Sequence, residues 1–339
     1  MTHKGIYIYG IVKNDCVTAI KSALSESGVY TIEYEDIAAV VSDTKLEKIE
    51  YMNREELARL LIDHQQKIEK LMSLGCSNII PMQLGTIVSS GNDVMKILEN
   101  GKKIFSDTFN KINGVEEIDI AAVWSNFGEF IKKVSENPQI IKMKAAIADK
   151  GSCNEADSIS IGKLIKEKID QKNSKVNLDV HNSLMPFCIA SKKHETMNDE
   201  MPVNYAFLVK KENHYLFINT IDELDSIYVN KLNFKIVGPL PCYSFYTAEC
   251  KAIRKADIDK AKSVLGIDLS SQEYDLKKAY RLKASLTHPD KQSNNVDDEG
   301  SSFTAANNAY KVLLDYGSII KQASSIELKD PFYLVKIKN

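Results

Sequence analysis

The sequence has 339 residues, of which 44% are hydrophobic, while glycine and proline number only 15 and 8. These values exclude collagen-like, proline-rich and wholly disordered chains, and the length indicates two domains, or three if one is small. Lysine and arginine total 44 against 46 acidic residues, so no global positive field gathers nucleic acid or an anionic membrane, and we expect neither as a partner.

The first third of the chain predicts a domain of mixed strands and helices. Asn53 followed three residues later by Glu56 indicates a capped helix start, and apolar side chains together with His64 then recur at helical spacing up to Gly75. Because strands and helices interleave without a regular βαβ period, the fold class is α+β. The other expected elements are a strand over 5–12, a helix over 17–24, a hairpin of 29–34 and 37–43, an apolar segment over 79–88, a helix over 93–109 and a strand over 118–124.

The middle of the chain begins with charged helical sequence over 127–170, broken at Asn137-Pro138 and by the polar stretch 151–158. A second α+β domain follows. Tyr243 and Phe245 alternate around Ser244, which predicts an apolar edge or core pair, or a docking surface where a peptide strand adds to a sheet edge. The expected elements here are a helix over 161–169, a loop over 193–202, a hairpin of 204–211 and 214–220, and a strand over 233–241 closed by prolines.

No targeting, metal or catalytic signal stands out. The apolar stretch 5–12 is too short for a signal-peptide core with its cleavage site, and no later run is long enough for a bilayer span, so we expect a soluble, cytoplasmic protein. The six cysteines are scattered without a C-x-x-C pair, which indicates reduced thiols rather than disulfides or a metal site. His64 lies among leucines and is expected to be packed rather than catalytic. With no phosphate-binding loop, G-x-G-x-x-G or G-x-S-x-G motif, we expect no enzyme activity and no cofactor.

The sharpest pattern lies between residues 260 and 316. This stretch resembles the J domain of the DnaJ co-chaperone family, which implies docking on a DnaK-type chaperone ATPase and stimulation of its ATP hydrolysis. The matching residues are Val264-Leu265-Gly266-Ile267, Leu276-Lys277-Lys278-Ala279-Tyr280-Arg281, His288-Pro289-Asp290-Lys291, Phe303, Asn307, Ala309, Tyr310, Val312 and Leu313.

The local chemistry agrees with that resemblance. Ser270 and Glu273 form a capping box pattern that starts a helix, and Pro289 ends it, so the following loop presents His288 and Asp290 outward. At helical spacing a basic face stands opposite an apolar one made of Leu276, Ala279, Tyr280 and Leu286. The residues expected to contact the chaperone are therefore Lys277, Lys278, Arg281, His288, Pro289 and Asp290.

Two departures from the J-domain pattern support an alternative. Leu282 precedes Lys283, whereas the family places a basic residue before leucine, and this order puts a lysine on the buried face. The usual basic motif of a fourth helix is also missing. The alternative is a J-like hairpin that packs within this protein and recruits nothing. A final strand over 330–338 that returned to a sheet of the main body would make the module an insertion.

The rest of the chain, from about residue 5 to 246, resembles the GvpF/GvpL family of gas vesicle proteins. The resemblance implies two α+β domains, ferredoxin-like in part, and an accessory or minor structural role in gas vesicle formation. The expected partners are the apolar shell protein GvpA and other minor vesicle proteins. Gln83, Leu84, Leu240 and Cys242 depart from the family pattern. The residues that carry the resemblance are 7–12, 37–42, His64, 81–86, Ile161-Gly162, 204–209 and 238–245.

These observations predict a cytoplasmic, non-enzymatic gas vesicle assembly protein that binds GvpA and recruits a DnaK-type chaperone. Tyr243 and Phe245 are the expected shell-protein contacts. The alternative is a structural component of the vesicle whose J-like segment only packs internally. The expected organisation is an N-terminal α+β domain over 1–125, a helical connector over 126–160, a second α+β domain over 161–250, a J-like helical module over 257–322 and a C-terminal strand or tail over 323–339.

Overall fold

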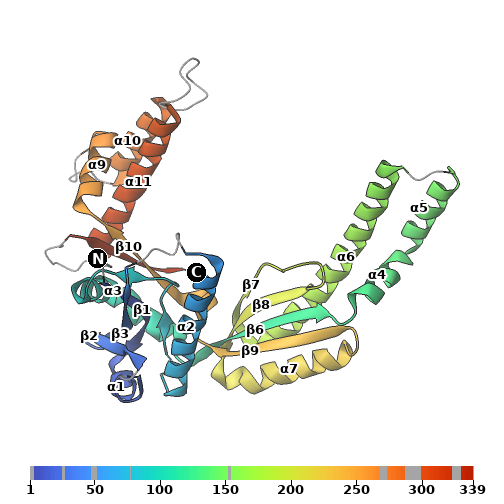
Figure 1. The fold of residues 1–339 in the computed structure, drawn as a ribbon, viewed down its shortest axis with the longest axis horizontal. Helices are drawn as coiled ribbons and strands as arrows, with labels where there is room; N and C mark the ends of the chain where they lie inside the picture. Colours follow the sequence, from blue (N-terminus) through green and yellow to red (C-terminus); the bar gives the residue numbers. More distant parts are fainter. Residues whose placement is uncertain are drawn as a thin grey trace. The chain divides into compact units, whose positions relative to one another are not determined.

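The computed structural model describes residues 4–24, 27–46, 52–76, 78–151, 154–267, 273–286, 299–322 and 330–338 (Figure 1). The chain forms two compact units. One joins residues 1–111 with residues 246–339, and the other comprises residues 112–245. Each unit combines a sheet with helices, and the α+β class is confirmed.

The sheet of the first unit has the strand order β2-β3-β1-β4, with antiparallel neighbours. Read along the chain, this is the βαββαβ arrangement of ferredoxin-like folds. Because β1 lies inside the sheet, it is buried along almost its whole length. The elements of the first unit up to this point are β1 (Lys4–Lys13), the 3-10 turn Asn14–Cys16, α1 (Val17–Leu24), β2 (Val29–Tyr34), β3 (Ile37–Lys45), α2 (Arg54–Ser73), β4 (Ile80–Pro81), β5 (Ile87–Val88) and α3 (Gly91–Ile112).

The capped start predicted for α2 is confirmed. The Asn53 side chain accepts hydrogen bonds from the backbone N–H groups of Glu55 and Glu56, and the Glu56 carboxylate accepts one from the Asn53 N–H. This reciprocal box satisfies backbone donors that the first helical turn leaves without partners. The helix runs to Ser73, and Gly75 follows with a positive φ of 88°.

A two-stranded ribbon extends the first unit. Strands β10 (Thr247–Ile253) and β11 (Phe332–Lys338) pair antiparallel over their full length. The ribbon adjoins β4, because the N–H of Gln83 donates to the carbonyl of Ala248 at 2.7 Å. Helix α3 holds the other strand, since the Asn100 side chain donates to the carbonyl of Tyr333 at 3.1 Å.

Helices α9 (Lys255–Leu265), α10 (Glu273–Leu286) and α11 (Glu299–Gln322) lie between the two ribbon strands in the sequence. The predicted final strand therefore exists, but it pairs with β10 in a separate two-stranded sheet rather than with the main sheet, and the helical module is an insertion into this hairpin (Figure 1). One apolar core joins ribbon and helices. Its buried members are Ile253, Ile258, Ala261, Leu265, Leu276, Ala306, Ala309, Leu313, Ile319, Phe332 and Leu334.

The second unit repeats the βαββαβ arrangement with the strand order β7-β8-β6-β9 and antiparallel neighbours throughout. Helices α6 (Glu155–Leu184) and α7 (His214–Ile227) cover one face of the sheet, and Val180 of α6 and Phe217 of α7 are buried in one core with Phe207 of β8. Helices α4 and α5 lie beside α6 (Figure 1). The elements are β6 (Val115–Trp124), α4 (Phe127–Ser135), α5 (Pro138–Ala148), α6 (Glu155–Leu184), the 3-10 turn Met185–Phe187, β7 (Cys188–Lys193), β8 (Val203–Lys210), the 3-10 turn Lys211–Asn213, α7 (His214–Ile227), β9 (Leu232–Leu240) and α8 (Tyr243–Tyr246).

The helix predicted over 161–169 is part of the longer α6, and two further predicted elements differ in type or in partner. Residues 214–220, expected as a strand, begin helix α7, because Phe217, Ile221 and Leu224 continue at helical spacing and are buried together. Strand β6, expected within a first domain over 1–125, pairs with β8 and β9 in the middle of the second sheet. The N-terminal segment of the first unit therefore ends at residue 111 rather than at residue 125. None of the helices within the described ranges has the length and apolar character that a bilayer span requires.

Candidate interaction surfaces

The predicted basic face is present on α10. Lys277, Lys278 and Arg281 are exposed there. On the opposite side Leu276 is buried, and Tyr280 stacks on Tyr310 of α11 with ring centroids 4.4 Å apart. Packing against α11 therefore determines which side of α10 meets solvent. His288, Pro289 and Asp290, together with Ser270, lie outside the described residues.

The unusual Leu282-Lys283 order has the expected consequence. Lys283 is half-buried on the packed side of α10, while Leu282 is 65% exposed. Leu286 corrects one prediction, because it is 59% exposed rather than part of the apolar face. At about 100° per residue it lies about 80° from Leu276, at the edge of the packed arc in the last turn. Two exposed leucines therefore border the basic face.

Ion pairs reinforce the attachment of the helical module to its ribbon. Asp315 of α11 binds Lys251 of β10 at 2.8 Å and Lys336 of β11 at 2.9 Å. Burial alone would raise the pKa of the Asp315 carboxyl, but the hydrogen bonds from both lysines outweigh burial and lower this pKa. The carboxylate is thus held in its charged form, in contact with both strands of the hairpin.

Tyr243 and Phe245 do not alternate along a sheet edge as predicted. They are half-buried in α8, a single helical turn whose second residue, Ser244, is bound by a buried carboxylate. The backbone N–H of Ser244 donates to Glu117 Oε2 and its hydroxyl to Oε1, both at 2.8 Å. The Lys192 ammonium donates to the Ser244 carbonyl at 3.0 Å. These hydrogen bonds stabilise the helical turn of α8. They explain why residues 243–246 do not continue strand β9.

Sequence reasoning did not single out Glu117, which binds the α8 turn. It lies within β6 and is only 1% exposed. Burial, the largest cause, raises the pKa of the Glu117 carboxyl to about 7, and the neighbouring Asp119 adds to the increase against the two bonds from Ser244. The sequence signal was the spacing of Glu117 and Asp119 two residues apart in a strand that is mostly apolar apart from Glu116, which places both carboxyls on one sheet face.

The Ser244 hydroxyl also lies 3.3 Å from Nε2 of His194. Its shorter contact, however, is to Glu117 Oε1, at 2.8 Å. In a serine hydrolase the histidine takes the hydroxyl proton and a carboxylate orients that histidine. Here the carboxylate of Glu117 itself binds Ser244, so the Glu117–Ser244 pair stabilises the α8 turn.

His64 on α2 belongs to a second buried polar cluster. Its Nδ1 lies 2.8 Å from the hydroxyl of Tyr7, which also accepts the N–H of Gly85 at 3.1 Å. The neighbouring Tyr9 hydroxyl donates to Asp63 at 3.1 Å. His64 is buried, as predicted for a packed histidine. Burial lowers the pKa of its imidazole to about 4, although the charge of Asp63 acts in the opposite direction.

The His64 imidazole is therefore expected to stay neutral down to about pH 5, because burial disfavours its charged form. Carbon-13 labelling of the histidine Cε1 positions, followed by NMR titration, measures this directly, and the His64→Gln variant assigns the resonance. In urea the same resonance should titrate near the ordinary histidine value of about 6.5. A folded-state midpoint near 6.5 would contradict the assignment of His64 as a buried neutral group.

In the part of the chain that the structure describes, no group of histidine, cysteine, aspartate and glutamate side chains is arranged to hold a metal ion. The predicted contact residues that the structure describes are Lys277, Lys278 and Arg281 on α10, and Tyr243 and Phe245 on α8. They lie in different places: the basic face on α10 belongs to the first unit, whereas Tyr243 and Phe245 belong to the second.

Comparison with known proteins gives two matches along the chain. The family model described as gas vesicle synthesis protein GvpL/GvpF matches residues 5–247. The chain is 23% identical over 243 residues to gas vesicle protein F of Nostoc sp., covering 71% of this chain and 97% of that protein. Gas vesicle protein F of Haloferax mediterranei is 19% identical over 242 residues, with 71% and 92% covered. The crystal structure of GvpF from Anabaena sp. has a similar fold, with a TM-score of 0.58 at 21% identity over 71% of this chain and 97% of that one.

The second match covers the inserted helices. The DnaJ domain model matches residues 263–318. Chaperone protein DnaJ of Fusobacterium nucleatum is 48% identical over 56 residues, which are 15% of this chain and 14% of that protein. The J protein JJJ1 of Saccharomyces cerevisiae is 42% identical over 52 residues, with 15% and 9% covered.

Proposed function

The chain belongs to the GvpL/GvpF family of gas vesicle synthesis proteins and carries a DnaJ domain, and on this basis we propose that it is a cytoplasmic assembly protein of gas vesicles. In this proposal the family portion binds the shell protein GvpA and other minor vesicle proteins, and the J-like module recruits a DnaK-type chaperone. The shell subunit is apolar, so it needs to be held until it is added to the growing wall.

The observation that carries the proposal is the insertion of the J-like module into the β10-β11 hairpin. Two strands, a shared core and the Asp315 ion pairs tie the module to the first unit. A chaperone bound to the module is therefore kept at a high effective concentration beside whatever the family portion holds. Tethering at both ends of the module makes this placement tighter than a flexible tail would.

The proposed chaperone contact consists of the exposed Lys277, Lys278 and Arg281 on α10 together with the loop containing His288, Pro289 and Asp290. The supporting fact is that the three basic side chains share the solvent side of α10. Exposed cations of this kind steer and orient an acidic partner surface.

The proposed shell-protein contact includes Tyr243 and Phe245. They lie next to β9, the outer strand in the sheet order of the second unit, and residues 235–239 of that strand are exposed. An edge strand with adjacent half-buried aromatic side chains supports a binding mode in which an apolar segment adds to the sheet.

The shared core favours a second candidate function. Leu334 of the ribbon packs with Ala309 and Leu313 of α11, and Lys283 occupies the packed side of α10. A module so closely joined to the body suits a structural component of the vesicle in which the J-like helices only pack internally. Stoichiometric retention in purified vesicles would support this candidate, and absence from them would support a transient assembly role.

The deciding experiment is steady-state ATP hydrolysis by the host's DnaK-type chaperone with the full chain, with the His288→Gln variant and with the double variant Lys277→Glu/Arg281→Glu. We expect stimulation by the wild-type chain and its loss in both variants. Lys311→Glu, a charge reversal at an exposed position of α11, serves as the control outside the proposed contact and should keep stimulating. No stimulation by the wild-type chain, under conditions where the host's own J protein works, would reject chaperone recruitment.

A further inference from the structure

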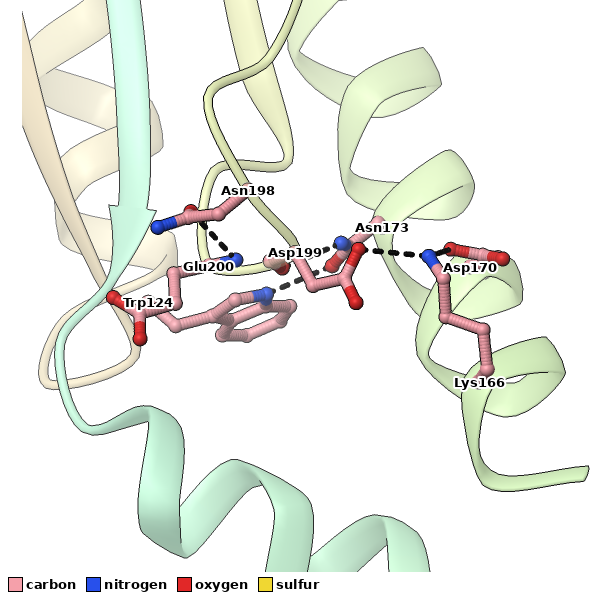
Figure 2. Close-up of polar contacts among 7 residues, drawn as sticks. All are labelled: Trp124, Lys166, Asp170, Asn173, Asn198, Asp199 and Glu200. Atoms are coloured by element: carbon pink, nitrogen blue, oxygen red, sulfur yellow. Dashed lines mark hydrogen bonds and ion pairs between the residues drawn. The ribbon is translucent and has the colours of Figure 1, made fainter. Parts of the chain in front are cut away.

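An aromatic platform lies at the end of β6 in the second unit. Trp124 stacks on Phe130 of α4 with ring centroids 4.0 Å apart and an interplanar angle of 18°. Figure 2 shows how polar contacts fix the indole: its Nε1 donates to Asn173 of α6 at 2.8 Å, and the Asn173 amide donates to the carbonyl of Asp199 at 2.8 Å. The backbone N–H of Trp124 donates to the carbonyl of Glu200 at 2.9 Å. The platform is therefore held in place from several sides.

This platform forms the floor of a cavity of about 410 Å³. Tyr228 and Val176 complete the apolar part of the lining. The rim is cationic, because lysines from α4, α6 and the turn before β9 surround the aromatic floor, and Glu129 is the acidic residue among the lining side chains. We refer to this site as the lysine trough; its rim consists of Lys133, Lys172, Lys175 and Lys231.

The rim lysines have no carboxylate within ion-pair distance in the part of the chain that the structure describes. Lys166, on the same helix α6, provides the contrast: it binds both Asp170 and Asp199, at 2.6 and 2.7 Å (Figure 2). Lys166, which contacts the loop that supports Trp124, is thus paired with carboxylates. The lysines of the trough rim are not paired in this way. Like charges that converge without counterions attract an anionic partner.

The trough continues along the seam between α4 and α6. A second cavity of about 450 Å³ shares Lys133, Lys172 and Lys175 with the first and adds Lys168 and one acidic residue, Glu136. Lys168 and Val176 are separated by about 12 Å along the axis of α6, at about 1.5 Å per residue. The site is therefore elongated, with cations along its length and the aromatic floor at one end.

We propose that the lysine trough binds an acidic segment of a partner protein, with an aliphatic or aromatic side chain of that segment on Trp124 and its carboxylates against Lys133, Lys172 and Lys175. The elongated form favours a peptide segment over a compact anion, because a single phosphate group would meet only part of the row of lysines. The apolar floor supplies an anchor pocket for one side chain, as at the centre of protein interfaces. This site is independent of the J-like module and of Tyr243 and Phe245.

The test uses the full chain, because Trp124 is its single tryptophan and its fluorescence reports the trough directly. The probe is a short synthetic peptide of glutamate and aspartate with a central leucine, and the control peptide carries glutamine and asparagine instead. We expect the acidic peptide to change Trp124 fluorescence with an affinity that falls as salt is added. The Lys172→Gln/Lys175→Gln variant should bind it about tenfold more weakly.

The matched control is Lys132→Gln/Lys163→Gln, which removes two exposed lysines from α4 and α6 outside the trough lining, and it should bind like the wild type. Equal weakening in both variants, equal binding of the amide peptide, or no fluorescence change would overturn the proposal. ATP is the competing probe. Binding of ATP that excludes the peptide would assign the trough to a phosphate-bearing small molecule and reject a protein segment.

Discussion

Replacing Leu334 by alanine is expected to lower the free energy of unfolding of the first unit by about 2–5 kcal/mol. Leu334 lies in β11, is only 1% exposed and packs in the core that joins the ribbon to α9 and α11. The substitution removes buried methyl groups and leaves a cavity beneath the helices, and both effects destabilise the folded state. The loss should appear in the helices of the J-like module as well as in the ribbon.

Urea unfolding followed by far-ultraviolet circular dichroism measures this change, and Trp124 fluorescence provides an internal reference because Trp124 belongs to the second unit. Ile320→Ala is the matched control on α11, since Ile320 is 48% exposed and its truncation should change stability by no more than about 0.5 kcal/mol. If Leu334→Ala behaved like this control, the ribbon and the helices would not share a core, and the tethering argument for chaperone recruitment would fail.

The second unit is expected to lose about 2–3 kcal/mol of stability as the pH rises from 5 to 8 because of Glu117. Burial raises the pKa of this carboxyl to about 7 in the folded state, while the unfolded chain has a value of about 4.3. Between these values the folded protein holds a proton that the unfolded chain has released. Stability therefore falls with increasing pH through this window and levels off above the folded-state pKa.

Urea unfolding at pH 5 and pH 8, followed by Trp124 fluorescence, reports this unit specifically. Glu117→Gln should remove most of the pH dependence, because the amide is neutral throughout and the Ser244 hydroxyl can turn to accept from it. Glu223→Gln, at an exposed position on α7, should keep the wild-type slope. The same slope in wild type and Glu117→Gln would show that Glu117 ionises without penalty and would contradict its role as the buried anchor of α8.

Local sequence signals predicted most of the elements correctly. The Asn53 capping box started α2, and Asn137-Pro138 separated α4 from α5. The spacing of Leu276, Tyr280 and the basic residues identified the two sides of α10. These features depend on neighbours within about one helical turn, so the pattern of the residues is sufficient to recognise them.

The incorrect predictions concern segments whose structure depends on contacts with residues far away in the sequence. Residues 214–220 form a short apolar run that suits a strand or a helix, and their packing beneath the second sheet selects the helix. Strand β6 follows the first unit in sequence but pairs with β8 and β9, whose paired residues lie 81 to 123 positions later. Ser244 makes a turn of α8 because Glu117, which lies in a different strand, binds it.

The sequence by itself determined the α+β class, the two family resemblances, the placement of most helices and strands, and the amphipathic character of α10. Only the tertiary structure decided that the same βαββαβ topology occurs in both units, that the J-like module is inserted between paired strands, and that Trp124, Lys133, Lys172 and Lys231 surround one trough. The reason is physical: helix periodicity and capping are encoded by adjacent residues, whereas strand pairing, burial of Glu117 and convergence of lysines arise only when separate segments pack together.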